Sequence, residues 1–221
     1  MRKYPDNPTL LGYLNKAYRA TGQTDSVVAV TNRIIAKDST AVVPALEAAS
    51  VLIQPPAAGK GRDSTATPAP AGADSVPKTR VKEAVPFLQF AIQHGDAQAK
   101  ENAAALLYTG AAPLLQQPQD LQGAAELLRM AVSAANPSGK VAPAANYLLG
   151  LATLFQVPQI DPQAEKTKSC DLAKQEETLL GEAETALTNG QAVNPQAVAK
   201  NLDIIKKYKP RIASMLKAYC K

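Results

Sequence analysis

The side chains best suited to chemistry are few in this sequence and lie far apart. One histidine, His94, and two cysteines, Cys170 and Cys220, occur among the 221 residues. Catalytic triads, zinc sites and dithiol redox motifs each need several such groups, and no GxSxG, HExxH or CxxC motif is present. We therefore predict that the protein is not an enzyme and uses no metal or other cofactor.

The remaining candidate groups have ordinary structural explanations. The Gly-Lys-Gly run at 59–61 lies in low-complexity sequence, without the strand and helix that a phosphate-binding loop requires. His94 precedes Gly95 at the expected end of a helix, where a cation complements the helix dipole. Neighbouring carboxylates, such as Glu176 and Glu177, lie on polar helices, where we expect a solvated face. None of these groups alters the prediction of a non-enzymatic protein.

The two cysteines are 50 residues apart, too far for a metal-knuckle motif. Both would lie near the open end of a helical hairpin whose turn falls around 189–194. We favour a Cys170–Cys220 disulfide over two inert thiols. Such a bond would stabilise the fold by about 2 to 4 kcal/mol, mainly by limiting the unfolded chain. It would also indicate an oxidising, extracytoplasmic compartment: periplasm, cell surface or secretion.

The composition predicts an all-α protein. Aromatic residues make up only 5% of the chain, there is no tryptophan, and 41 residues are alanine. Alanine has the highest helix propensity, whereas strands favour aromatic and β-branched residues. Apolar residues at helical spacing predict nine helices. We expect these helices at about 8–20, 24–34, 40–53, 79–94, 97–115, 121–135, 144–155, 162–188 and 195–220.

Residues 55–77 interrupt the helical pattern with a run rich in Pro, Ala, Ser and Thr. The run lacks large apolar residues before Val76, so it cannot offset the entropy of ordering itself. We expect a flexible insertion, either a plain linker or an O-glycosylated, mucin-like segment. Four hydroxyl side chains would carry the glycan: Ser64, Thr65, Thr67 and Ser75.

The first expected helix lies in NPTLLGYLNKAYRATG, residues 7–22, which carries Leu11, Ala17, Tyr18 and Gly22. These four residues occupy signature positions of the tetratricopeptide repeat (TPR), and the segment resembles the first helix of that family. The family's second helix carries Ala, a large residue and Ala at fixed spacing. Two later helices repeat that spacing: Ala84, Leu88 and Ala91, then Ala124, Leu128 and Ala131. The repeats are degenerate, and they cover most of the chain.

This resemblance implies a single domain over 1–221: a right-handed α-solenoid of about four TPR-like helix hairpins and a C-terminal capping helix. Residues 162–221 would form a long, disulfide-tied helical hairpin. By the same resemblance, a monomeric adaptor of this family binds a peptide or protein segment in a concave groove lined by the first helix of each pair. The groove positions are Asn15, Arg19, Asn102 and Asn146.

The C-terminal helix has one apolar and one basic face. Residues 195–221 contain seven Lys and Arg and a single acidic residue, Asp203, a net charge of +6. Val198, Ile205, Ile212 and Tyr219 repeat every seven residues. Aromatic side chains hardly interleave with the basic ones, so we expect no nucleic-acid partner and prefer a terminal cap of the solenoid.

The N-terminal end lacks such a cap. Apolar side chains lie on more than one side of the first helix, so we expect this end to bind a missing segment, a partner or another copy of the chain. A heterologous contact between repeat ends that does not close would build filaments. The expected self-association surface comprises Leu10, Leu11, Tyr13, Leu14 and Tyr18 at one end, with Ile205, Tyr208 and Ile212 at the other.

Two further expectations concern the membrane. The longest run of small or apolar residues, 103–115, is far shorter than the roughly 20 residues that span a bilayer, so we expect no transmembrane helix. Residues 1–7 (MRKYPDN) lack the apolar stretch of an intact secretory signal, so we expect that the chain is either not exported or a mature or truncated form.

The leading hypothesis for the function is a non-enzymatic, extracytoplasmic scaffold that assembles with copies of itself into a structural polymer. The groove-binding adaptor is the alternative.

Overall fold

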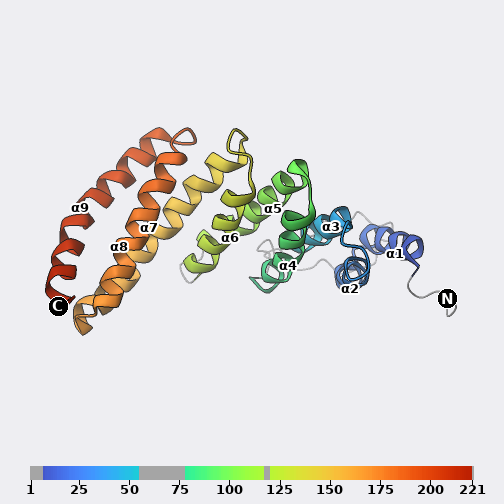
Figure 1. The fold of residues 1–221 in the computed structure, drawn as a ribbon, viewed down its shortest axis with the longest axis horizontal. Coiled ribbons are helices and arrows are strands. Elements are labelled where there is room, and N and C mark those ends of the chain that lie inside the picture. Colours follow the sequence, from blue (N-terminus) through green and yellow to red (C-terminus); the bar gives the residue numbers. More distant parts are fainter. Residues whose placement is uncertain (1–6, 55–77, 117–119, 221) are drawn as a thin grey trace, which may run out of the picture. The chain divides into compact units, whose positions relative to one another are not determined.

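The computed structural model describes residues 7–54, 78–116 and 120–220, and within these ranges all regular secondary structure is helical (Figure 1). The prediction of an all-α fold is confirmed. The insertion at 55–77, with its four hydroxyl positions Ser64, Thr65, Thr67 and Ser75, lies outside the described residues.

The described residues form nine helices, and most of the expected boundaries agree with them within a few residues. The helices are α1 (Pro8–Ala20), α2 (Thr24–Ile35), α3 (Val42–Ile53), α4 (Lys78–His94), α5 (Ala97–Leu115), α6 (Leu121–Ala134), α7 (Val141–Thr167), α8 (Cys170–Asn189) and α9 (Pro195–Tyr219). They group into two compact units, residues 1–106 and 107–221, and α5 begins in the first and ends in the second. A single domain over 1–221 stays a prediction.

In the first unit, α1 packs on α2, α2 on α3, and α3 on α4. The Asn7 side chain caps α1 by accepting from the backbone N–H of Thr9 at 2.9 Å, with Pro8 in the first helical position. Gly22, at a φ of +69°, ends α1 in the left-handed region that glycine tolerates best. This tight turn brings Leu11 of α1 against Val30 of α2.

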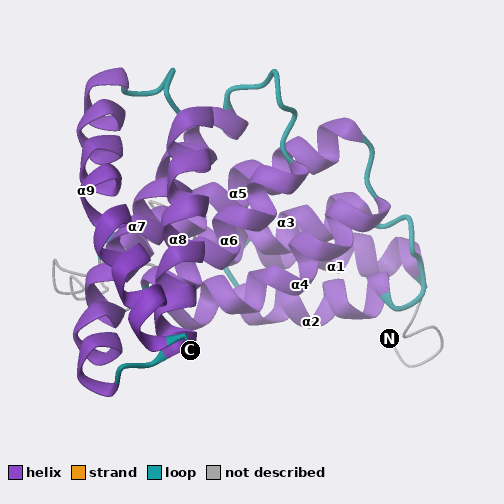
Figure 2. Cartoon of the chain, turned by 60° about the vertical axis from the view of Figure 1, so that its left-hand side comes forward, coloured by secondary structure: helices purple, strands orange, loops and turns teal. Residues whose placement is uncertain are grey.

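In the second unit, neighbouring helices from α6 to α9 also pack in chain order, and α9 additionally touches α7 (Figures 1 and 2). One apolar core joins the last three helices. We call it the main cluster, and its buried members are Leu154, Val157, Leu179, Leu180, Ala183, Leu187, Val198, Ile205 and Ile212. The apolar face of α9 is therefore buried against α7 and α8.

The expected break between 155 and 162 was wrong, because α7 runs without interruption for 27 residues. Proline weakens a helix by removing one hydrogen bond and crowding the preceding turn. Pro158 and Pro162 are both exposed, on the solvent side of α7, while the opposite side buries Val157 and Ala164. That packing outweighs the local cost. The chain turns instead at Lys168, at a φ of +50°, so the hairpin expected over 162–221 begins at α8.

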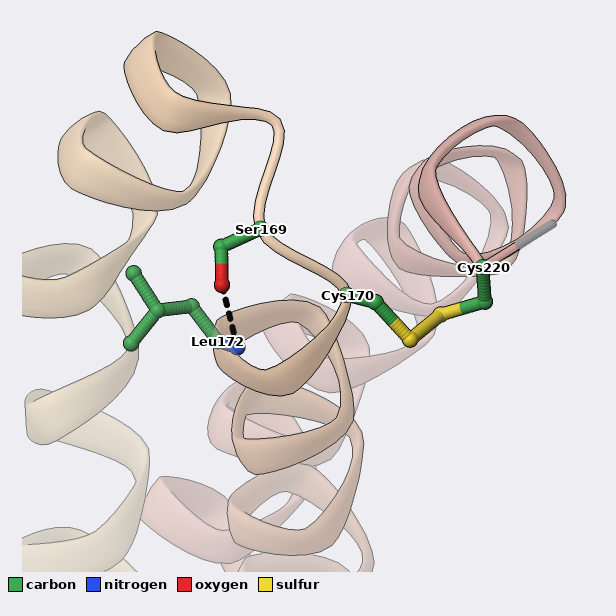
Figure 3. Close-up of a disulfide and its surroundings, with 4 residues drawn as sticks. All are labelled: Ser169, Cys170, Leu172 and Cys220. Carbon is green, nitrogen blue, oxygen red and sulfur yellow. Dashed lines mark hydrogen bonds between the residues drawn. A yellow bond between two sulfur atoms is a disulfide. The ribbon is translucent and has the colours of Figure 1, made fainter.

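The disulfide joins the first residue of α8 to the residue that follows α9. Cys170 and Cys220 are bonded at an S–S distance of 2.07 Å (Figure 3). Beside them, the Ser169 hydroxyl accepts from the backbone N–H of Leu172 at 3.3 Å and caps α8. The predicted pairing is thus present, and it fastens the end of α9 to the start of α8.

Replacing either of two helical glycines of the second unit with alanine should change the free energy of unfolding in opposite directions. A Cβ atom on Gly150 would lie 2.5 Å from Cγ of Leu187, whereas one on Gly181 would meet nothing within 4 Å. Gly150→Ala should lower the free energy of unfolding by about 1 to 3 kcal/mol through overpacking. Gly181→Ala should raise it by about 0.5 to 1 kcal/mol, because alanine favours the helix. Urea unfolding followed by circular dichroism would measure both. Equal effects would contradict the close α7–α8 approach.

Candidate functional site: interaction grooves

The first unit has a shallow groove, which we call the N-terminal groove, between α3 and the start of α5. Its volume is about 340 Å³. The side chains and backbone that line it are Val42, Val43, Leu46, His94, Gly95, Asp96, Gln98, Ala99 and Asn102. Val43 is 65% exposed there, an uncommon exposure for a large aliphatic side chain. Asp96 accepts from the backbone N–H of Ala99 at 2.8 Å and fixes the start of α5. This hollow offers apolar surface with polar groups at one end.

The second unit has a larger groove, which we call the C-terminal groove, of about 570 Å³. α6 and α8 form its walls, and Asn146 and Leu149 of α7 lie between them. The other lining residues are Arg129, Val132, Ser133, Thr178, Gly181, Glu182, Thr185, Ala186 and Asn189. The lining combines apolar side chains with hydroxyl groups, which suits a segment with small apolar side chains and a polar backbone.

An ion pair connects the two walls of the C-terminal groove. Arg129 of α6 donates to both carboxylate oxygens of Glu182 on α8, with Nε–Oε1 at 2.6 Å and Nη2–Oε2 at 2.7 Å. This bidentate contact raises the pKa of Arg129, since the carboxylate favours the charged guanidinium. The two charges neutralise each other, so the groove's binding capacity rests on shape, apolar area and hydroxyl groups.

The four groove positions expected from the family resemblance divide into two groups. Asn102 lines the N-terminal groove, and Asn146 lines the C-terminal groove, where its Nδ2 donates to the carbonyl of Ala142 at 2.9 Å. Asn15 and Arg19 line neither groove. Asn15 is 3% exposed and donates from Nδ2 to the Thr31 hydroxyl at 2.9 Å, and Arg19 pairs with Glu47 of α3. These two side chains hold α1 to its neighbours in the first unit.

The residues expected to form the self-association surface also divide. On α1, Leu10 is 50% exposed and Tyr13 65% exposed, while Leu14 and Tyr18 are half-buried. Three of the set are buried: Leu11, Ile205 and Ile212. The two isoleucines belong to the main cluster, and Tyr208 is half-buried against it, so the apolar face of α9 is already covered. Exposed lysines at 200, 206, 207 and 217 lie along α9 instead.

The candidate groups for catalysis lie apart from one another. His94 is exposed at the end of α4, with its ring 4.6 Å from that of Phe90. Across residues 7–54, 78–116 and 120–220, no three His, Cys, Asp or Glu side chains are placed to hold a metal ion. No helix in these ranges is long and apolar enough to cross a bilayer.

Sequence reasoning missed one unusual group, Glu176 of α8. We expected it on a solvated face, but its side chain is fully buried, and within the part of the chain that the structure describes neither carboxylate oxygen has a hydrogen-bond partner. Burial raises its pKa to about 7, assisted by the negative charge of Asp161. A signal was present: Glu176 continues the buried stripe of Ala173, Leu180, Ala183 and Leu187 at three- and four-residue spacing.

The comparisons with known proteins do not assign a family. No protein-family model matches the chain, and no curated protein or solved structure matches it. We therefore infer the function of the protein from the grooves, the exposed apolar residues and the sequence.

The buried hydrogen bond from Asn15 to Thr31 predicts how the free energy of unfolding should change when Thr31 is replaced. Thr31→Val replaces the buried hydroxyl with a methyl group of similar size and leaves the Asn15 amide without its acceptor. The free energy of unfolding should fall by about 1 to 3 kcal/mol, the cost of an unpaired buried polar group. In Asn15→Leu/Thr31→Val both polar groups are gone, so most of the loss should be recovered. Chemical denaturation of Asn15→Leu, Thr31→Val and the double variant provides the measurement, and a loss in the double variant equal to the sum of the two single losses would show that the contact contributes little.

Proposed function

We propose that this protein is a non-enzymatic scaffold of TPR-like helical repeats that binds a segment of another protein. The observation that carries the proposal is the C-terminal groove. Its volume is about 570 Å³, α6 and α8 form its walls, and α7 lies between them at its floor. The placement of Asn102 and Asn146 in hollows of the two units supports it, because the family resemblance assigns ligand contacts to these positions. The right-handed solenoid belongs to the same proposal.

The lining of the C-terminal groove favours a particular kind of segment. Val132, Leu149 and Ala186 offer apolar contacts, and the hydroxyls of Ser133 and Thr185 lie beside them. A short helical or extended peptide with one or two small apolar side chains would fill the floor. Its polar groups would meet the hydroxyls at the walls. Because Arg129 and Glu182 are already paired, a peptide without strong net charge is favoured.

We place the protein's activity in an extracytoplasmic compartment. The disulfide between Cys170 and Cys220 supports this location, since such bonds persist in oxidising environments and are rare in reducing cytosol. A direct test is thiol labelling of protein taken from its source under denaturing, non-reducing conditions. Two labelled cysteines would contradict the proposed location.

Peptide selection with the whole chain tests the groove. Random twelve-residue peptides displayed on phage should yield binders, and synthetic versions should bind in solution by fluorescence anisotropy. Thr185→Trp fills the groove and should weaken binding at least tenfold. Thr188→Trp is the matched control, because both threonines are exposed on α8 and donate to the carbonyl four residues earlier, but Thr188 does not line the groove. Selected peptides that bind both variants as well as the original would exclude this groove.

Self-association through α1 is a second candidate, favoured by the exposure of Leu10 and Tyr13. These side chains offer apolar surface on a helix whose exposed charges include Lys16 and no acidic residue. An end-to-end filament would require this helix to meet α9 of the next copy, whose exposed side is basic. Repulsion between like charges weighs against that contact, so the groove is the leading proposal.

Light scattering over a wide concentration range tests self-association. If α1 forms the contact, the molar mass should rise above 23.2 kDa and fall back to it in Leu10→Glu/Tyr13→Glu. Lys16→Glu is the control, because it changes the net charge of α1 by the same amount without removing apolar surface. A mass that settles at a small multiple indicates a closed oligomer, and one that climbs steadily indicates a filament. A constant 23.2 kDa would reject this candidate.

A further inference from the structure

The α7–α8–α9 bundle has a layered end, beyond its main cluster. Nearest the disulfide lies a small apolar layer, the terminal cluster, formed by Ala164, Ala173 and Met215. One turn further in, three of its neighbours along the helices are charged: Asp161 on α7, Glu176 on α8 and Arg211 on α9. We call these three residues and Glu165 the polar layer. Along α7 and α8 it lies between the terminal cluster and the main cluster, and Leu216 of α9 packs against both clusters.

The polar layer has one more carboxylate than its cation can satisfy. Arg211 donates to Oδ2 of Asp161 at 2.5 Å and to Oε1 of Glu165 at 2.7 Å. Glu176 is 0% exposed, and neither its two oxygens nor Oδ1 of Asp161 has a hydrogen-bond partner among the described residues. An ionised Glu176 would thus be a buried charge without a hydrogen bond, whereas a protonated one is neutral and gains a hydrogen-bond donor.

The charged groups that act on Glu176 come from both helices packed against α8. Asp161 and Glu165 of α7 disfavour its ionisation, Arg211 of α9 favours it, and burial adds the largest effect, so the pKa of Glu176 rises to about 7 from an ordinary 4.5. Its neighbour Glu177 is exposed. Among the charged groups of the described residues, the two carboxylates at the end of α7 therefore add to the effect of burial, and Arg211 opposes it.

The end of α7 buries few apolar side chains. Pro158 and Pro162 have no N–H to donate, so two backbone hydrogen bonds are missing there. Beyond Val157, only Asp161 and Ala164 of this helix are buried. By contrast, the disulfide fastens α9 to α8. A segment with few buried apolar contacts opens more readily than the core to which it is attached.

We propose that the polar layer is a pH-dependent latch for residues 158–167: protonated Glu176 keeps the end of α7 closed, and ionised Glu176 opens it while the disulfide holds α8 and α9 together. The closed form retains its proton up to about pH 7, and the open form loses it near the ordinary value of 4.5. Closure is therefore strongest at low pH, weakens as the pH rises between these values and changes little above them.

Amide hydrogen exchange on the full, oxidised chain tests the latch. Between pH 5.5 and 8.0, the opening equilibrium of 158–167, after correction for intrinsic exchange rates, should rise about 25-fold. Residues 179–187 of the main cluster are the internal reference and should change much less. Glu176→Gln should remove the rise, because its side chain does not titrate. Glu177→Gln should keep it, since this neighbour on α8 is exposed.

Three outcomes would overturn the latch: an unchanged rise in Glu176→Gln, a rise in 158–167 of less than threefold, and an equal rise in 179–187, which would mean that the whole unit loses stability. The profile of the unmodified chain decides the last two, whether or not the variant folds. The variant Cys170→Ser/Cys220→Ser tests whether the disulfide limits the opening. Without it, the pH-dependent rise in the opening equilibrium should spread to 211–219. If these residues stay protected, the disulfide does not limit the opening.

Discussion

Close approach of neighbouring helices through small side chains is the constraint on which this structure depends. α7 and α8 touch where Gly150 meets Leu187 and again where Gly190 meets the backbone of Tyr147, and a Cβ atom on either glycine would clash at 2.5 Å. Alanines with no exposed surface fill many of the other contacts. They include Ala45, Ala48, Ala84, Ala91, Ala124, Ala131, Ala145, Ala152, Ala173 and Ala183. The protein thus gains contact by proximity where other folds use large aromatic side chains.

The grooves arise from the same geometry. α6 and α8 each pack against α7, and they enclose a hollow over it. At the floor of the C-terminal groove, Asn146 and Leu149 of α7 lie beside Ala186 of α8. A hollow of this kind keeps a fixed shape, because the helices that form its walls are each held by packing on the helix between them. It is therefore suited to recognition by shape, with the Arg129–Glu182 pair fixing the distance between the walls.

Much of this fold could be predicted from the sequence, and the failures have physical reasons. Apolar residues at helical spacing placed α1 and α6 closely, and the caps that the structure shows there, Asn7 and Asp120, act locally as well. The continuity of α7 through 155–162 could not be predicted, because its two prolines break a local rule and only tertiary packing outweighs their cost. The burial of Asn15 depends on Thr31, sixteen residues away. In the candidate site, the family resemblance named Asn146, which lines the C-terminal groove, but the Arg129–Glu182 pair joins residues 53 apart that no short pattern connects.

Glu176 shows the limit of sequence reasoning most clearly, since residue type and position pointed in opposite directions. Its type predicted solvent, and its spacing predicted the core. The structure follows the spacing, because a three-helix bundle must bury whatever occupies that stripe. A buried carboxylate costs stability, and Arg211 is already shared by Asp161 and Glu165. The terminal cluster is too small to offset this cost, having two alanines and one methionine as its buried members. The disulfide lies on the far side of that cluster, where a covalent bond can keep two helix ends together across the weak layer. The proposed latch therefore depends on one feature: the polar layer lies about two turns from the helix ends, beneath the terminal cluster.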